Sequence, residues 1–563
     1  MPRIPVGPAG SVGIVSDLSP ARVPPEGWTS GLNVDFDGAE ARRMQDWETV
    51  YNITVSSTTA TQSLAIEPYF LMDVEASAVH HWIYAGQNKV YVATPNANQT
   101  NITRQSATST ASITSTSPDK DYSASLSLRW NGAVLAGVPL LNNGKDYPQY
   151  WSPVDTSQRL QELQWDDSAG TKWSTVTAGP VTCAVLRSYR EFGVALHTTE
   201  NNVDFPLRVR WSHQAATGSI PSTWDATRLD KDAGSKDLDE TEGHVLDGRP
   251  LRGSFVVYKS DACWAMRYVG GAAVMSFDSL FEGTIGLFTT DGVVPFHGKH
   301  FLLAQNDIIV HDLVEPINLG KHNKMVRRFF NDVSETYKNL THVLAYPEDR
   351  QIWVVYPSTS ATTCDRALVW DWERDLWAIR ELPEVNHVAY GFVQPPTVGD
   401  TWDTDDGGWD GWNLSWAEGP ASPNKRALIA ARGPAKALVQ MAQGYSWDGT
   451  GRTAFLERTH LPIVGIDRQG NPIVDMGAIK QVSALYPQIR APEGTVFSIR
   501  IGAQMFESGA VKWAPAATFT VGTDHRITRI ATGRFIAVRI ETDAAVDWRL
   551  SEYSLEIDVV SRF

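Results

Sequence analysis

Six segments of the sequence repeat one plan: a strand-like apolar run, a polar loop, and a second run that carries an aromatic residue. The runs are rich in Val, Ile, Trp, Tyr and Phe, a composition typical of short strands. The segments begin at Trp82, Trp130, Arg190, Ser254, Phe301 and Gln351. Their spacing of roughly 45–65 residues is that of propeller blades. With one weak helix signal, in 323–331, the sequence predicts an all-β protein with an irregular β-propeller of about six blades between residues 60 and 395.

The chain after Lys425 continues as strands of another kind. Apolar and polar residues alternate at 478–489, 496–501, 517–521, 535–542 and 553–559. This alternation is typical of strands with one buried face, so the region predicts a C-terminal antiparallel β-sandwich, or platform domain. We therefore expect three parts: an N-terminal arm and hairpin at 1–59 that packs with the platform, a propeller at 60–425, and a sandwich at 426–563.

Residues 13–43 form a distinctive N-terminal segment. Prolines at 20, 24 and 25 exclude a helix and favour an open path, and Trp28 supplies an apolar anchor. Asp37 and Gly38 lie between two extended stretches, which is a strong hairpin signal because both turn residues must tolerate a positive φ. From its residues alone, the segment is an arm and a hairpin docked on a β domain.

Composition limits the partners of this chain. Its net charge of −15 argues against tight, non-specific nucleic-acid binding, which needs a surface rich in Lys and Arg. A net negative charge suits a channel wall that repels phosphate and lets DNA slide past. Alternatively, it only keeps the protein soluble. The three cysteines, Cys183, Cys263 and Cys364, fit neither a disulfide framework nor a zinc site, so we expect buried thiols made in a reducing cytoplasm. No signal peptide and no apolar run of bilayer length is visible.

The sequence offers little chemistry. It has no Gly-x-Ser-x-Gly, no phosphate-binding loop and no His-Glu-x-x-His. The carboxylates of 403–410 do not match an EF-hand, although a loop-bound cation there stays open. We interpret the carboxylates Asp371, Glu373 and Asp375 as parts of a hairpin turn flanked by tryptophans. The sequence singles out no pair of carboxylates that could serve as the catalytic pair of a glycosidase. We therefore expect no enzymatic activity, no cofactor and no metal.

A row of tryptophans lies in the segment 400–416. Trp402, Trp409 and Trp416 recur every seven residues, but three nearby glycines argue against a coiled coil. We interpret the row as a boundary loop whose indoles dock onto the propeller or a neighbouring subunit, since an exposed row would be a sticky patch. Stacking on sugars is the alternative.

The order of motifs along the chain resembles that of tail nozzle proteins (tail tubular protein B type) of short-tailed bacteriophages. The N-terminal counterparts are Asp17, Pro20, Pro24, Pro25, Gly27, Trp28, Asn33, Phe36, Asp37, Gly38, Arg42 and Arg43. Further counterparts are Pro148–Trp151, Arg210–Ser212, Pro221–Asp225, Phe255–Lys259, Ile309–Asp312, Val369–Trp377 and Gly533–Leu550. Leu313 departs from the family's glycine. Each motif alone is weak, but together they span nearly the whole chain.

The resemblance implies a structural virion protein, made in the host bacterial cytoplasm and assembled into the tail. Such proteins form homohexameric rings below the portal and adaptor, build the distal tube, retain and conduct DNA without binding it tightly, and support tail fibres or spikes. No stable membrane insertion is implied. The residues expected at assembly interfaces are Trp28, Asn33, Asp37, Gly38, Arg42, Arg43, Trp402, Trp409 and Trp416. The competing hypothesis is a propeller that binds or cleaves host-surface glycans.

Overall fold

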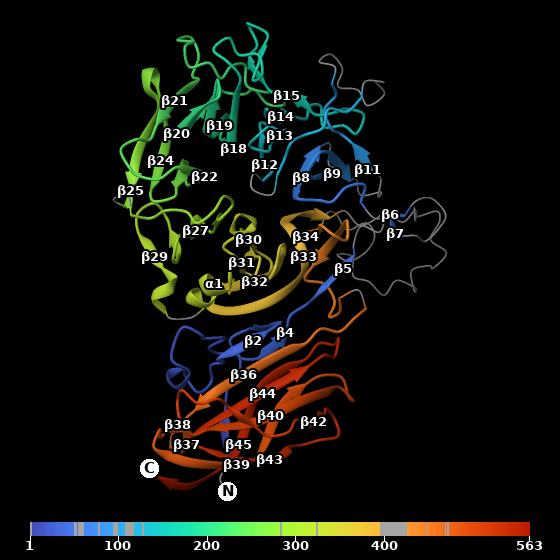
Figure 1. Cartoon of the computed structure of the whole chain (residues 1–563), viewed down its shortest axis with the longest axis vertical. Coiled ribbons are helices and arrows are strands. Elements are labelled where there is room, and N and C mark those ends of the chain that lie inside the picture. The colour runs from blue at the N-terminus through green and yellow to red at the C-terminus, as the bar shows by residue number, and fades with distance from the viewer. Residues whose placement is uncertain are drawn as a thin grey trace, which may run out of the picture.

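A ring of small sheets stands on a β-sandwich in this protein, and strands of the N-terminal arm within residues 30–43 lie between the two (Figure 1). The computed structural model describes residues 3–49, 53–54, 61–62, 64–76, 79–93, 99–106, 118–125, 129–281, 284–322, 325–393, 425–447, 449–467, 469 and 472–562. The expected all-β architecture, a propeller with a C-terminal sandwich, is confirmed.

Five four-stranded antiparallel sheets follow one another around the ring in chain order. The first contains β8 (Phe70–Ala76), β9 (Val79–Ala85), β10 (Val90–Ala93) and β11 (Gln99–Asn101). The second contains β12 (Asn131–Leu135), β13 (Val138–Asn142), β14 (Gln149–Tyr150) and β15 (Gln161–Glu162). The third contains β18 (Val181–Tyr189), β19 (Phe192–Glu200), β20 (Val203–Trp211) and β21 (Gly234–Asp237). The fourth contains β22 (Val245–Leu251), β23 (Ser254–Lys259), β24 (Cys263–Gly270) and β25 (Val274–Leu280), and the fifth β26 (Val293–Phe296), β27 (Lys299–Leu303), β28 (Ile308–His311) and β29 (Pro316–Asn318).

A seven-stranded sheet completes the ring. Its order is β30 (His342–Tyr346), β31 (Gln351–Tyr356), β32 (Cys364–Asp371), β33 (Leu376–Val393), β34 (Lys425–Arg432), β35 (Ala437–Met441) and β5 (Trp47–Thr49). The first part of β33 pairs with β32 and its second part pairs with β34. Glu384, at φ +52°, lies between the two parts. One strand therefore ends the sixth blade and begins a seventh.

Each of the six repeated sequence segments lies in one of the first six blades. None of them lies in the seventh blade. Its other strands come from both sides of those segments: β34 and β35 follow residue 424, and β5 precedes residue 50. The boundary expected at 425–426 therefore falls inside β34, and the sandwich begins only with β36. Likewise, the expected arm of 1–59 gives β5 to the propeller.

The sandwich has two six-stranded sheets, and both include N-terminal strands. One sheet contains β3 (Val34–Phe36), β4 (Ala41–Arg43), β45 (Arg549–Arg562), β39 (Ala478–Arg490) and β43 (Ile527–Gly533), with β1 (Arg3–Val6) also on β45. The other contains β2 (Ser30–Leu32), β36 (Ala454–Leu461), β44 (Phe535–Thr542), β40 (Val496–Gln504) and β41 (Lys512–Trp513), with β42 (Ala517–Thr520) on β40. The arm thus packs with the platform by main-chain pairing.

Minor elements occupy other described residues. A single 3-10 turn, η1 (Pro20–Arg22), lies in the arm, where the prolines predict no helix. Three two-stranded ribbons pair β6 (Ile53–Thr54) with β7 (Thr61–Gln62), β16 (Gln164–Asp166) with β17 (Thr171–Lys172), and β37 (Ile463–Ile466) with β38 (Pro472–Val474). The weak helix signal corresponds to α1 (Val326–Asp332). No helix in the described part of the chain is long and apolar enough to cross a bilayer.

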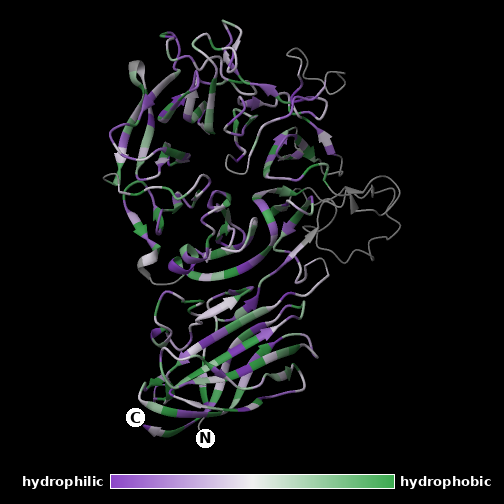
Figure 2. Ribbon diagram, viewed as in Figure 1, coloured by the Kyte–Doolittle hydropathy of each residue, from purple (hydrophilic) through white to green (hydrophobic). Residues whose placement is uncertain are grey.

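The hydrophobic core runs without a break from the ring into the sandwich. One cluster joins Trp353 and Trp377 of the sixth blade to Trp28 of the arm and Trp548 of the sandwich. Figure 2 shows hydrophobic and hydrophilic residues interspersed along the strands of both parts. All three cysteines are buried and free, as their spacing predicts.

Buried histidines join neighbouring blades of the ring. The Tyr258 hydroxyl lies 2.7 Å from both His300 Nδ1 and His311 Nε2, and His300 Nε2 lies 3.0 Å from the Pro250 carbonyl oxygen. These contacts are satisfied when both rings are neutral: His300 donates to Pro250 and accepts from Tyr258, which accepts from His311. Burial lowers the pKa of His300 to about 3 and that of His311 to about 4.

A second histidine pair lies where the sixth and seventh blades meet. The rings of His342 and His387 stack with centroids 4.9 Å apart. The Val388 amide donates to His342 Nε2, and His342 Nδ1 donates to the Leu340 carbonyl oxygen. Burial, with the charge of Arg129, lowers the pKa of His342 to about 3, and burial beside His342 also lowers the pKa of His387.

We predict that mild acid destabilises the propeller. Each of these four histidines has a pKa below its unfolded value of about 6.5, so the unfolded chain takes up protons that the folded ring excludes. The free energy of unfolding should therefore fall by about 1.4 kcal/mol per histidine for each pH unit below 6.5. Urea unfolding from pH 7 to pH 4.5 measures this slope. His311→Gln should reduce it, and an unchanged slope in this variant would contradict the assignment.

Candidate functional site

The N-terminal arm contacts both halves of the molecule. Its amide groups at Ile14 and Asn33 donate to the carbonyl oxygens of Trp377 and Ile379, both on β33 of the ring. Its strand β2 pairs with β36, and its strands β3 and β4 join β45, all in the sandwich. The arm is therefore a seam that holds ring and sandwich together.

Asn33 is the central residue of this seam. Its backbone is left-handed, with φ +58°, which asparagine tolerates better than most residues. Its Nδ2 donates to the Thr453 carbonyl oxygen at 2.9 Å, and its Oδ1 accepts from the Glu381 amide at 2.9 Å. One buried side chain thus links the arm, the ring and the segment that leads into the sandwich.

Trp28 anchors the arm from inside the molecule. The indole is 1% exposed, and its Nε1 donates to the Ala9 carbonyl oxygen at 2.8 Å. The ring centroid lies 5.7 Å from that of Tyr553 on β45. Its apolar surface is therefore used within one chain.

The predicted hairpin at Asp37 and Gly38 joins β3 to β4. Gly38 has φ +91°, and Asp37 Oδ1 accepts from the amides of Ala39 and Glu40 at 3.0 and 2.7 Å. Partial burial opposes ionisation of Asp37, but these two donors and the nearby charge of Arg42 outweigh it and lower its pKa. The turn is thus fixed by local hydrogen bonds and faces solvent.

The two arginines of the hairpin have different surroundings. Arg42 donates through Nε and Nη2 to Asp35 Oδ2, at 3.2 and 2.8 Å, and its side chain stays 37% exposed. Arg43 has a fully buried side chain whose Nη2 donates to Asp46 Oδ2 and to the Arg452 carbonyl oxygen. The two side chains point to opposite faces because β4 is a strand.

These positions correct part of the expected assembly surface. Trp28, Asn33 and Arg43 are buried within one chain and cannot contact a neighbouring subunit in this structure. Asp37, Gly38 and Arg42 remain accessible. Trp402, Trp409 and Trp416 lie outside the described residues. The sequence motif located the seam but could not distinguish an internal joint from an interface between subunits.

A second polar centre lies on the inner strands of the ring. Arg187 of β18 donates through Nε and Nη2 to both carboxylate oxygens of Asp247 of β22, at 2.8 and 2.9 Å. Arg187 Nη2 and Arg249 Nη2 both donate to Asp291 Oδ1, at 2.7 and 2.8 Å. These paired charges hold the pKa of Asp291 below its usual range despite burial.

Arg129 connects the second blade to the sixth and seventh blades. It precedes β12 of the second blade, yet it donates to the carbonyl oxygens of Leu340 and Asn386, which belong to the sixth and seventh blades. Side chains therefore cross the middle of the ring. No sequence motif marks this polar centre, because its members lie far apart in the sequence: Asp291 is 104 positions from Arg187. The available signal was an arginine, Arg187, within the largely apolar strand β18.

The described residues offer no evident site for metal chemistry, since no group of three or more His, Cys, Asp or Glu side chains among them is arranged to hold an ion. The carboxylates of the turn at Asp371 serve local structure: Asp371 Oδ1 accepts from the amides of Glu373 and Arg374, and Asp375 accepts from the Trp370 indole.

Comparisons with known proteins give only distant structural likenesses. No protein-family model matches the sequence, and no curated protein is significantly similar to it. Hsv2 of Kluyveromyces lactis aligns with 63% of this chain and 98% of its own, at 10% identity and a TM-score of 0.32. The N-terminal domain of Nup159 aligns with 72% and 95%, at 10% identity and a TM-score of 0.32. Hsv2 of Kluyveromyces marxianus is covered over 63% of its length, at 11% identity and a TM-score of 0.24. Matches this weak say nothing about function.

Changes at Asn33 should separate its side-chain role from its backbone role. Asn33→Gly keeps the left-handed backbone but leaves the Thr453 carbonyl and the Glu381 amide unpaired, costing about 1–3 kcal/mol of unfolding free energy. Asn33→Ala should cost about 1 kcal/mol more, because alanine is strained at a positive φ. Urea unfolding measures both variants. Stability equal to that of the unchanged protein in Asn33→Ala would contradict the seam.

The inner ring network should be more sensitive than an exposed ion pair of the same geometry. Asp247→Asn removes one charge from a fully buried pair, so we expect a loss of about 3–5 kcal/mol. Asp237 pairs with Arg208 at 2.7 Å but is 42% exposed, so Asp237→Asn should cost at most about 1 kcal/mol. Thermal unfolding compares the two variants, and equal losses would contradict a buried network.

Proposed function

We propose that this chain is a structural subunit of the nozzle of a short phage tail. The observation that carries the proposal is the position of the family-like N-terminal segment. Its resembling residues, among them Trp28, Asn33 and Gly38, form the seam between ring and sandwich. The N-terminal part of the resemblance thus lies where the two halves of the molecule are joined, which suits a subunit that must hold its shape in a ring.

In this proposal the subunits assemble into a homohexameric ring below the tail adaptor. The sandwich serves as the platform, and the ring of blades extends away from it (Figure 1). Tail fibres or spikes attach to the assembled tail. Accessible residues of the hairpin, Asp37 and Arg42, are the candidates for contacts with a neighbour or the adaptor.

DNA would pass between subunits rather than through the propeller. Arg187 forms buried ion pairs with Asp247 and Asp291 on the inner strands of the ring, and Arg129 reaches across to the Leu340 and Asn386 carbonyl oxygens. Opening this centre would break ion pairs that are buried from water, which is costly. The conduit would instead be the central opening of the assembly, where a net charge of −15 per chain disfavours adhesion of phosphate.

Assembly tests the proposal directly. The purified chain, mixed with its tail adaptor ring, should form sixfold rings in negative-stain electron microscopy and hexamers in mass photometry. Arg42→Glu should weaken these rings and also lower the melting temperature, because it places a second carboxylate beside the largely buried Asp35. Ala39→Arg, at the exposed tip of the same turn, should weaken the rings alone. A monomer that ignores the adaptor and cleaves polysaccharide would contradict the proposal and support a glycan-active propeller.

DNA binding gives a separate prediction. We expect affinity weaker than micromolar at physiological salt, with little dependence on salt, because few phosphates would be neutralised. Fluorescence anisotropy with duplex DNA at several salt concentrations measures this. Nanomolar affinity with a steep salt slope would contradict a non-adhesive conduit.

A further inference from the structure

A group of exposed aliphatic side chains lies at one end of the sandwich. Figure 1 shows β37, β38 and the C-terminus together at this end, away from the ring. Six of the fifteen large hydrophobic residues that are exposed in the described part of the chain belong to the group, each 41–57% exposed. We call it the end patch, and its members are Ile466, Ile473, Val474, Met476, Val559 and Val560.

Strand pairing makes the six residues of the end patch neighbours. β37 pairs with β38, so the first three members share one two-stranded ribbon. Met476 follows this ribbon, and Arg534 donates through Nε and Nη2 to its carbonyl oxygen, at 2.9 and 2.8 Å. Arg562, at the end of β45, has its Nε 3.6 Å from Asp475 Oδ2, beside Met476. The ribbon and the end of β45 therefore form one surface.

Val560 is held outward by an irregularity in the sheet. In the pairing of β39 with β45, Lys480 lies opposite Val559 and Ile479 lies opposite Ser561. Val560, between these two pairs, has no partner and forms a β-bulge. Bulges re-aim side chains and are common at sheet edges. The backbone thus fixes the exposure of the most accessible member of the end patch.

The ribbon beside these side chains has open edges. In the described part of the chain, β37 and β38 pair only with each other. A two-stranded ribbon is marginally stable by itself, and an open edge offers N–H and C=O groups to a further strand. Exposed aliphatic side chains next to an open strand edge suit a protein partner, which supplies both apolar contact and main-chain pairing.

The charge distribution indicates which protein is suited to this surface. The net charge of the whole chain is −15, so two copies repel each other over most of their surface. Residues 450–563 are the exception, because they contain 13 Lys and Arg against 12 Asp and Glu. The C-terminal sandwich strands are therefore the part of the chain at which a second copy approaches without this repulsion.

We propose that a second copy of this chain docks on the end patch. The inference rests on the proposed function, since it assigns one contact between neighbouring subunits of the ring. The aliphatic side chains would form the apolar centre of this contact, and the ribbon edge would extend it by main-chain pairing. In a closed ring the end patch meets a different surface of the neighbour, because a patch that meets itself ends growth at two copies.

Sedimentation velocity of the full chain, from about 1 to 100 µM, tests this docking. We expect species larger than the monomer to increase with concentration. Val560→Asp should weaken self-association by about tenfold or more, because a carboxylate would be buried without a partner. Val269→Asp, on β24 of the ring, is the matched control, with 56% exposure against 57% for Val560, and should change nothing. Melting temperatures show whether each variant is folded.

The outcomes separate the end patch from the proposed function. Ile473→Asp, also within the end patch, repeats the test if Val560→Asp does not fold. Undiminished association in these folded variants would overturn the docking site, while rings formed by the unchanged protein would still support the nozzle. Association that stops at dimers would support the docking site but contradict a hexameric ring. A chain that stays monomeric throughout would overturn the inference, and loss of adaptor binding in Val560→Asp would then assign the end patch to the adaptor.

Discussion

Main-chain pairing between the two ends of the chain is the constraint on which the rest of this structure depends. Strands β1 to β4 of the N-terminal arm complete both sheets of the C-terminal sandwich, and β5 completes the seventh blade. Neither the sandwich nor the last blade is whole without the first 49 residues. Closing so long a loop has an entropic cost, which the pairing of these strands must offset. The seam therefore joins the ring and the sandwich into one body.

Much of the fold could be predicted because it depends on local patterns. Each of the six repeated segments lies in one blade, and the Asp37–Gly38 turn closes the hairpin as its residues require. The alternation of 535–540 likewise gives a sandwich strand, β44. Period, turn chemistry and strand composition act over a few residues, so a single sequence displays them.

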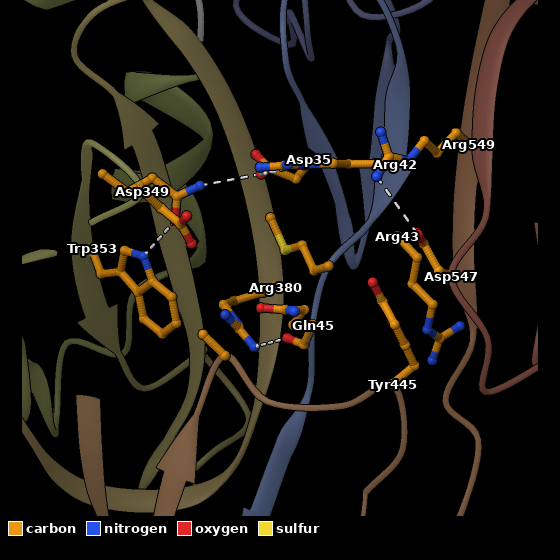
Figure 3. A pocket seen from close by; sticks show the side chains of 13 residues that line it. Asp35, Arg42, Arg43, Gln45, Asp349, Trp353, Arg380, Tyr445, Asp547 and Arg549 are labelled. Carbon is orange, nitrogen blue, oxygen red and sulfur yellow. Dashed lines mark hydrogen bonds and ion pairs between the residues drawn. The ribbon is translucent and has the colours of Figure 1, made fainter. Parts of the chain in front are cut away.

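The missed features all depend on distant pairing. The seventh blade joins β33 to strands from both sides of the six segments, and no local pattern marks such a combination. Asn33 resembles an ordinary polar residue before a hairpin, and only its contacts with Glu381 and Thr453 show that it is internal. Arg187 and Asp291 meet across 104 positions, and a cavity between ring and sandwich (Figure 3) draws its lining from residues 35 to 549. A motif can mark such a residue without saying what it touches.

The central claim is that the arm is an internal joint of each chain before any assembly. Hydrogen exchange of the single, unassembled chain tests it most directly. The amides of Ile14, Trp28, Asn33 and Met44 all donate to carbonyl oxygens within the chain. Peptides covering 13–44 should therefore exchange as slowly as those of β39 and β44 in the sandwich core. Exchange within seconds in the single chain, with protection appearing only on ring assembly, would show that the arm is an interface between subunits and would contradict this account.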